Sequence, residues 1–303
     1  MLSYAVVGSG AIGAFYGGKL AYAGCHVDFL FHSDFDHVRT NGLIVNSCNG
    51  NFSLSPDLIG VYDDVWRMPK ADVVIVGLKT VREELVGQLV APLLKDDSVV
   101  LLIQNGIGVE DDVQRMLPGT QLVAGLAFIC SSKTQPGVVD HHFFGSLNLG
   151  PFSLRNRDFF SQVISDFSRA GVDVHEVEYA QARWMKAVWN VPFNGLSVVL
   201  DCQTDTLVAS QPALELVRGI MDEVVGAARA LGVSGVDDAH ADKMVMMTKE
   251  MVPYSPSMRL DRIYGRPLEI QYIYNKTIQA AAAAGFSMPR TEMLMRQLMV
   301  ISR

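Results

Sequence analysis

A glycine-rich turn near the start of the chain restricts the fold more than any other feature of the sequence. The apolar run of residues 4–7 is followed by GSGAIG, which has the spacing G-x-G-x-x-G. Its glycines are Gly8, Gly10 and Gly13. A second apolar run, residues 26–31, follows after one helix length. A strand, a glycine turn, a helix and another strand in this order predict a βαβ unit.

Each glycine of this turn has a physical role. The first permits a tight turn, the second lets the backbone approach a pyrophosphate, and the third lets the helix pack on the strand. The helix N-terminus adds N–H donors and the positive end of its dipole. We therefore expect a dinucleotide-binding turn formed by Gly8, Ser9, Gly10, Ala11, Ile12 and Gly13.

Further apolar runs follow at the spacing of alternating strands and helices. They cover residues 71–79, 98–108, 120–130, 138–150 and 172–179, with a helical stretch over 81–94. Continuous apolar runs are typical of parallel strands that are buried on both faces. The pattern predicts a Rossmann-type, doubly wound α/β domain over residues 1–177.

The pattern changes in the second part of the chain. Segments with helical character cover residues 180–200, 204–231, 236–250, 255–263, 268–284 and 289–302. Glycine and proline separate these segments, as expected at helix ends. We predict an all-helical domain over residues 178–303, with a substrate bound where it meets the first domain.

The end of the second strand should select the cofactor. An acidic residue there would bind the ribose 2′-hydroxyl of NAD, whereas an Arg nearby would bind the 2′-phosphate of NADP. This chain has His32, Ser33 and Asp34 at that point. These residues by themselves leave the choice between NAD and NADP open.

Two polar residues follow predicted strands at the edge of the sheet where ligands bind in such folds. Lys79 ends VIVGLK, and Asn105 lies in QNGIG. Lys79 could instead be a solvated strand terminus, and Asn105 a turn residue before Gly106. We expect Asn105 to belong to the site.

A polar stripe runs through the apolar segment RWMKAVWNVPFN (183–194). Lys186, Asn190 and Asn194 are spaced four residues apart, so they share one face of a helix. Lys is rarely buried without a partner, so this face should meet a ligand, a carboxylate or water. The alternative is a helix edge exposed to solvent. Pro192 removes one backbone hydrogen bond and should kink the helix before Asn194.

Ser257 and Glu269 are further candidates in the helical part. Ser257 lies in YSPSMRLDRIYG, and Glu269 follows Pro267 at the start of a predicted helix. Ser257 could simply cap a helix, and Glu269 could complement a helix dipole. For each of the two residues, the sequence alone leaves the choice between a site role and a structural role open.

Composition excludes several functional classes. The net charge is −7 and there is no basic run, which argues against a nucleic-acid partner. The four cysteines and seven histidines show neither zinc-site nor disulfide-framework spacing, so we expect no metal and a cytoplasmic protein with reduced thiols. No apolar stretch of about 20 residues and no signal peptide is evident, so we expect no membrane association.

Taken together, these motifs resemble the 2-dehydropantoate 2-reductase (ketopantoate reductase) family over essentially the whole chain. The resemblance rests on GSGAIG, VIVGLK and QNGIG, on W-x-K-x-x-x-N-x-x-x-N at 184–194, and on S-M-x-x-D with Glu269 after it. It implies NADPH-dependent reduction of 2-dehydropantoate to (R)-pantoate, on the way to pantothenate and coenzyme A. It also implies a helical domain similar to that of 6-phosphogluconate dehydrogenase.

The resemblance assigns a role to each candidate. Lys186 matches the family's general acid, and Glu269 matches an acidic residue linked to it. Asn190, Asn194 and Ser257 match substrate-binding residues. Asn105 matches a residue that touches nicotinamide and substrate, and Lys79 a lysine near the cofactor. The resemblance implies NADPH as the cofactor. His32 stands where the family usually has Arg, so NADH is the alternative.

The chemistry of the stripe depends on the pKa of Lys186. Hydride transfer to a ketone leaves negative charge on oxygen, which Lys186 could protonate. Its ordinary pKa of about 10.4 is too high for an efficient acid near neutrality. Burial would lower this pKa and Glu269 would raise it, and the sequence leaves the balance open.

Two alternative functions and the oligomeric state remain open at this point. The scaffold could reduce another branched 2-oxo acid, or, although the polar stripe argues against it, the chain could be a sensor that binds NAD(P) without turnover. A homodimer is also compatible with the sequence. The helical part is rich in Met, and we expect these side chains to fill the core rather than an interface (Met244, Met246, Met247, Met251, Met293, Met295 and Met299).

Overall fold

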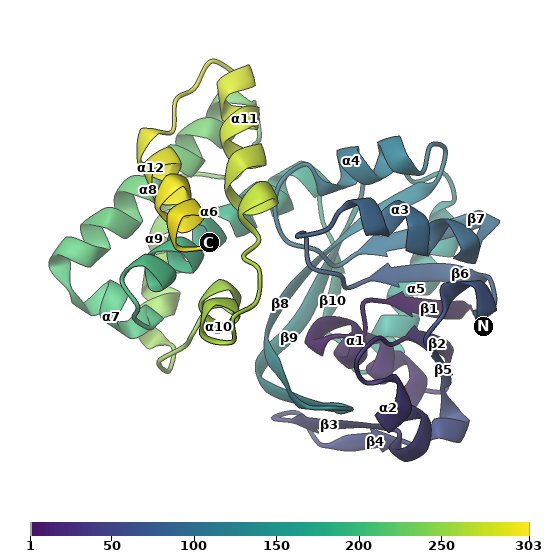
Figure 1. Cartoon of the computed structure of the whole chain (residues 1–303). Helices are drawn as coiled ribbons and strands as arrows, with labels where there is room; N and C mark the ends of the chain where they lie inside the picture. The colour runs from purple at the N-terminus through teal and green to yellow at the C-terminus, as the bar shows by residue number, and fades with distance from the viewer. Residues whose placement is uncertain (1, 303) are drawn as a thin grey trace. The chain divides into compact units, whose positions relative to one another are not determined.

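The computed structural model describes residues 2–302, which divide into two compact units. Unit 1 contains the chain up to Gln104 together with Glu110–Tyr179, and unit 2 contains Asn105–Val109 and the chain from Ala180 onward. Figure 1 shows a twisted sheet with helices in unit 1 and a helical arrangement in unit 2. The expected fold class, a Rossmann-type α/β part followed by an all-helical part, is confirmed.

The sheet of unit 1 has the strand order β4-β3-β9-β8-β7-β6-β1-β2-β5, and β10 also pairs with β9. Its strands are β1 (Ser3–Val7), β2 (His26–Leu30), β3 (Leu43–Ser47), β4 (Phe52–Leu54), β5 (Gly60–Tyr62), β6 (Ala71–Val76), β7 (Leu94–Leu102), β8 (Gln121–Gln135), β9 (Val138–Pro151) and β10 (Val174–Glu176). The accompanying helices are α1 (Ala11–Tyr22), α2 (Phe35–Asn41), α3 (Glu84–Val90), α4 (Val109–Met116) and α5 (Arg157–Arg169). Short 3₁₀ turns are η1 (Pro56–Leu58), η2 (Val65–Arg67) and η3 (Ala91–Leu93).

The sheet is mixed rather than wholly parallel. Strands β5, β2, β1, β6, β7 and β8 pair in parallel, as the strand–helix alternation predicts. Strands β8 and β9 are instead antiparallel and form a long hairpin. Only Pro136 and Gly137 separate them, and Gly137 has a φ of 68°. Proline followed by a residue with positive φ favours a tight turn, which leaves no room for a crossover helix.

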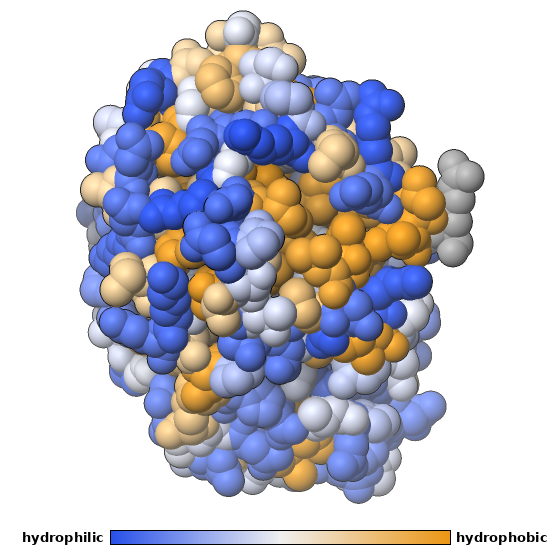
Figure 2. Space-filling view, turned by 90° about the vertical axis from the view of Figure 1, so that its left-hand side faces the viewer, coloured by the Kyte–Doolittle hydropathy of each residue, from blue (hydrophilic) through white to orange (hydrophobic). Residues whose placement is uncertain are grey.

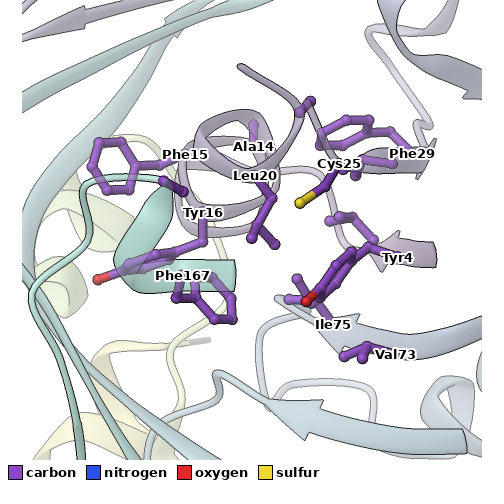
Figure 3. Packing of buried hydrophobic residues seen from close by; sticks show 14 of the residues in the cluster. Tyr4, Ala14, Phe15, Tyr16, Leu20, Cys25, Phe29, Val73, Ile75 and Phe167 are labelled. Carbon is purple, nitrogen blue, oxygen red and sulfur yellow. The ribbon is translucent and has the colours of Figure 1, made fainter. Parts of the chain in front are cut away.

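The core of unit 1 lies where α1 packs on β1. Tyr4 and Val6 of β1 are fully buried, and Figure 3 shows Tyr16 and Leu20 of α1 among the side chains of this cluster. A Cβ atom on Gly17 would lie 2.6 Å from a methyl group of Val6. The small residues of α1 therefore allow the helix to lie close to the strand, which positions the glycine turn at its N-terminus.

Unit 2 is built from helices joined by short connections. They are α6 (Tyr179–Val199), α7 (Thr204–Ala209), α8 (Gln211–Ala230), α9 (Asp238–Glu250), α10 (Ser257–Ile263), the π-helix η4 (Gln271–Asn275), α11 (Lys276–Ala283) and α12 (Pro289–Ile301). The helix expected over residues 204–231 is divided in two at Ser210. Pro212 lies at the start of α8 and has no N–H to continue the hydrogen bonding of α7.

The expectation that the methionines fill the core holds only in part: Met244 and Met295 pack against the core of unit 2, whereas the exposed ones do not. Met246, Met293 and Met299 are exposed, and the others of that group are half-buried. Both helices are amphipathic, and their inner faces are occupied by other residues, such as Val245 and Leu298. Figure 2 shows apolar residues, in orange, among the polar ones on one face of the molecule.

Two further observations concern the described residues. Between residues 2 and 302, no helix combines the length and the apolar character needed to cross a bilayer. Within the same range, no three His, Cys, Asp or Glu side chains gather in a way that could hold a metal ion, and none of the four cysteines forms a disulfide.

Candidate active site

The glycine turn keeps the backbone at the N-terminus of α1 accessible. Gly8 has a φ of 92°, and a Cβ atom there would collide with the backbone of Leu78. Gly10 is the N-cap of α1, and no atom lies within 4 Å of the place where its Cβ would be. The space in front of Gly10 is therefore open, and α1 directs its first N–H groups toward it. These residues fit a dinucleotide.

The other residues of the turn support its shape. The Ser9 hydroxyl donates a hydrogen bond to the carbonyl of Leu30 at 2.9 Å, which joins the turn to the end of β2. Ala11 and Ile12 begin α1, whose first turn contains no acidic side chain. An acidic residue there would repel a phosphate, so the composition of this turn also suits an anion.

The residues after β2 bear on the choice of cofactor. His32 is exposed, whereas Asp34 is buried. Lys133 donates to Oδ1 of Asp34 at 2.8 Å, and the backbone N–H of Gly137 donates to Oδ2 at 3.1 Å. Burial acts to raise the pKa of Asp34, but these hydrogen bonds outweigh it and the net shift is downward. The carboxylate is thus already engaged within unit 1 and is poorly placed to accept from a ribose hydroxyl.

Lys79 lies in the loop that follows β6, with an exposed side chain. Gln104, at the end of β7, donates a hydrogen bond to the carbonyl of Leu78 at 3.0 Å. The two loops at the carboxyl ends of neighbouring parallel strands are therefore joined in unit 1. This is the edge of the sheet at which ligands bind in such folds.

The polar face of α6 opens into a small pocket of unit 2. Lys186 and Asn190, one turn apart, both line it. Arg183, one turn earlier, also lines it and is only 3 % exposed. The remaining walls come from Gly106 and Ile107, Ala187 and Val191 of α6, and Ile273 and Thr277. The spacing of four residues thus places the polar groups of Lys186 and Asn190 in one pocket, as the shared helix face suggested.

The pKa of Lys186 is lowered to about 7. Desolvation by burial is the main cause, the positive charge of Arg183 lowers the pKa further, and the carboxylate of Glu269 raises it. As a whole, the Lys186 residue is half-buried. A lysine in this state is divided between its charged and neutral forms near neutral pH, which suits proton transfer.

Glu269 is 5 % exposed and directly precedes the helical stretch that contains η4 and α11. Its negative charge is close enough to act on Lys186. The structure thus brings Lys186 and Glu269 together within unit 2, although 83 positions separate them in the sequence.

Asn194 faces a neighbouring helix through well-defined hydrogen bonds. Its Oδ1 accepts from the backbone N–H of Met258 at 3.2 Å and from the Ser257 hydroxyl at 3.5 Å. Its Nδ2 donates to the carbonyl of Asn190 at 3.0 Å, and the residue is 2 % exposed. The side chain therefore ties α6 to the first turn of α10, and it brings Ser257 next to the polar stripe.

Pro192 lies inside α6 without ending it. Next to it, the Tyr274 hydroxyl donates to the carbonyl of Val191 at 2.9 Å and accepts from the N–H of Gly195. Val191 and Gly195 would bond to each other in a regular helix, so the hydroxyl is inserted into the hydrogen-bond ladder. This connects η4 to the helix that carries Lys186.

The segment Asn105–Val109 belongs to unit 2 although it follows a strand of unit 1. The N–H of Ile107 donates to the carbonyl of Tyr272 at 3.0 Å. Gly106 has a φ of 108°, and a Cβ atom there would lie 2.5 Å from Tyr272. Only glycine allows this approach, which places the residues after Asn105 in the wall of the Lys186 pocket.

Two polar residues of the pocket, Arg183 and Thr277, escaped the sequence analysis. Arg183 precedes Lys186 by three positions, a spacing that places both on one helix face, and it could have been found from that spacing. Thr277 is buried and its hydroxyl donates to the carbonyl of Ile273 at 3.0 Å. No sequence signal distinguishes Thr277 from any other helical threonine.

Comparisons with known proteins agree with this arrangement. Residues 4–153 match the family described as ketopantoate reductase PanE/ApbA, and residues 178–302 match its C-terminal part. The chain is 38% identical over 301 residues to the 2-dehydropantoate 2-reductase of Nostoc sp., covering 97% of this chain and 93% of that one.

Solved structures of 2-dehydropantoate 2-reductases also match nearly the whole chain. The 2-dehydropantoate 2-reductase of Geobacter metallireducens has a TM-score of 0.94 and 38% identity, with 99% of each chain covered. The enzyme of the same name from Methylococcus capsulatus has a TM-score of 0.89 and 30% identity, covering 99% of this chain and 96% of that one. The chain is therefore an oxidoreductase that belongs to the ketopantoate reductase PanE/ApbA family.

Proposed function

We propose that this chain reduces 2-dehydropantoate to (R)-pantoate, with NADPH as hydride donor and Lys186 as proton donor. The observation that carries the proposal is the state of Lys186, which lines a pocket with Asn190 and has a pKa of about 7. The names of the relatives support the choice of substrate.

The residues of the pocket suit the reduction of a charged ketone. Hydride addition to the C2 carbon turns its carbonyl oxygen into an alkoxide, and the Nζ of Lys186 donates the proton that this oxygen needs. The amide of Asn190 can hold a hydroxyl or carbonyl oxygen without adding charge. Arg183 and Lys186 together carry more positive charge than Glu269 compensates, which favours an anionic 2-oxo acid.

The cofactor belongs to the turn of unit 1. The residues Gly8–Gly13 would hold the pyrophosphate, and a bound nicotinamide cofactor would supply the hydride. Asp34 is engaged by Lys133 and Gly137, which removes the acidic acceptor expected for NAD, while the exposed His32 can meet a 2′-phosphate. These features support NADPH over NADH.

The test is steady-state turnover of 2-dehydropantoate, followed by the loss of nicotinamide absorbance with NADPH and with NADH. We expect turnover with a preference for NADPH, and we expect Lys186→Met to abolish it while the fold and cofactor binding persist. Turnover of a different branched 2-oxo acid, with none of 2-dehydropantoate, would refute the substrate. Cofactor binding without turnover of any 2-oxo acid would identify a sensor and refute the enzyme.

We further propose a cytoplasmic homodimer that serves pantothenate synthesis. The exposed apolar side chains of α9 and α12, including Met246, Met293 and Met299, support self-association. Growth of a pantothenate-requiring bacterial strain that expresses the chain tests the pathway. Sedimentation equilibrium tests the dimer, and a monomer throughout the micromolar range would refute it.

A further inference from the structure

The outer edge of β9 is interrupted. Strand β3 pairs with its first part, up to His141, and β10 pairs with Leu147–Leu149. Among the described residues, no strand pairs on this edge with residues 142–146. A cavity with a volume of about 250 Å³ opens at this gap, entirely within unit 1. It is separate from the Lys186 pocket, and none of the proposed catalytic residues lines it.

The gap in the pairing of β9 is stabilised by specific contacts. Phe144 has a φ of 65°, which is unusual for an aromatic residue, and the pairing of β8 with β9 shifts register beside it. The buried His141 ring holds this bulge, because its Nε2 lies 3.2 Å from the Phe143 carbonyl and 3.1 Å from the Phe144 carbonyl. A hydrogen bond of 2.9 Å joins its Nδ1 to the Ser47 hydroxyl. Strain that is fixed in this way occurs at functional sites.

Lys19 gives the cavity a positive charge. Its Nζ lies 6.0 Å from the ring centre of Phe15 and 5.4 Å from that of Phe52. Within residues 2–302 the ammonium forms neither an ion pair nor a hydrogen bond, although the chain has an excess of acidic residues. Asp173 also lines the cavity, but its carboxylate is largely exposed and lies 2.9 Å from His175. The charge of Lys19 therefore remains available to an anion.

The other walls combine apolar and polar groups. Phe15 and Phe144 supply aromatic surface, and Asn49 and Ser146 supply an amide and a hydroxyl that can donate hydrogen bonds. A ligand that fits these walls needs one negative group and an apolar body. Phosphate or sulfate alone would leave the aromatic surface uncovered.

We propose that this cavity binds a small organic carboxylate with an apolar body. The carboxylate lies at Lys19, within reach of Asn49 and Ser146, and the body packs on Phe15 and Phe144. The site is independent of the proposed reaction, since it uses no residue of the glycine turn or of the Lys186 pocket.

The test is the binding of phenylacetate to the full chain, measured by saturation-transfer NMR and calorimetry, beside its uncharged analogue phenylacetamide. We expect saturable millimolar or tighter binding of phenylacetate. Lys19→Met should weaken it about tenfold or more, as expected for the loss of a charge-assisted hydrogen bond. Lys70→Met, which removes an exposed lysine elsewhere in unit 1, is the matched control and should leave binding unchanged.

Two further variants test the aromatic wall of the cavity and its independence from the proposed active site. Phe144→Gly removes the ring but suits the positive φ, so the fold should persist while phenylacetate binding is lost. Lys186→Met alters only the proposed active site and should not affect binding. The proposal is overturned if phenylacetate does not bind, if phenylacetamide binds equally well, or if Lys186→Met rather than Lys19→Met abolishes binding.

Discussion

Arg183 lies one helical turn before Lys186 on α6, and both side chains line the same pocket. Two positive charges on one face of a helix repel each other, so Arg183 favours the neutral form of Lys186. Burial acts in the same direction, and Glu269 opposes both. The protonation of Lys186 is thus controlled by a small group of residues within unit 2.

This balance predicts the pH dependence of the reduction. Lys186 must be protonated to act as an acid, and it is protonated below its pKa of about 7. The rate of the hydride step should therefore be highest in mildly acidic solution and fall about tenfold per pH unit above the pKa. The measurement is kcat against pH with deuterated cofactor, to confirm that hydride transfer limits the rate. A flat profile between pH 6 and about pH 9 would contradict this role.

Substitution of Arg183 and of Glu269, the charged neighbours of Lys186, should shift the pH profile of kcat in opposite directions. Arg183→Gln removes a repelling charge, so the pKa of Lys186 rises and the falling limb moves to higher pH. Glu269→Gln removes an attracting charge, so the limb moves to lower pH. Arg183→Lys keeps the charge and is the control. Equal profiles for all variants would show that these charges do not act on the proton donor.

The sequence predicts those parts of the site that depend on local periodicity. The spacing of Lys186 and Asn190 indicates a common helix face, and both line one pocket. The glycine turn is equally local, because a strand, Gly8 and a helix suffice to recognise it. Arg183 follows from the same helical spacing once the pocket is known.

Features that depend on tertiary packing are not visible in the sequence. The apolar runs predict parallel strands, but β8 and β9 pair antiparallel through a two-residue turn, and Gly137 there resembles any other loop glycine. The same holds for the insertion of Tyr274 into α6 and for the packing of Gly106 on Tyr272. These contacts join segments that are far apart along the chain, so no short pattern records them.

Asn194 should differ from Asn190 in what its removal affects. Asn194 is buried and bonded to α10, so Asn194→Ala should lower the free energy of unfolding by about 1–3 kcal/mol through the unpaired Met258 N–H. Asn190→Ala should leave stability nearly unchanged but raise KM for the 2-oxo acid. Urea denaturation and steady-state kinetics of both variants test this contrast. Unchanged stability of Asn194→Ala would show that its hydrogen bonds contribute little.

His32 should control cofactor preference. His32→Arg adds a permanent positive charge at the end of β2, so KM for NADPH should fall while KM for NADH stays nearly constant. His32→Glu adds a carboxylate that accepts from a ribose hydroxyl and repels a phosphate, so preference should move toward NADH. The ratio of kcat/KM for the two cofactors is the measurement. If both variants keep the wild-type ratio, the 2′-position is recognised elsewhere.

Gly195 should be intolerant of a side chain because of Tyr274. A Cβ atom there would lie 2.6 Å from the Tyr274 hydroxyl and 2.6 Å from Leu294. Alanine favours helix by up to about 1 kcal/mol over glycine, but the clash displaces the hydroxyl that completes the ladder of α6. Gly195→Ala should therefore lower the free energy of unfolding by about 1–3 kcal/mol.

A helical glycine with room around it provides the control for this effect. At Gly18 of α1, a Cβ atom would lie 3.4 Å from Leu43 and Phe52, which is ordinary van der Waals contact. Gly18→Ala should leave stability unchanged or raise it by up to about 1 kcal/mol, since only the helix propensity changes. Thermal and urea unfolding of the two variants measure the difference. If Gly195→Ala is as stable as Gly18→Ala, α6 does not depend on the inserted hydroxyl, and its course past Pro192 is maintained by the remaining packing alone.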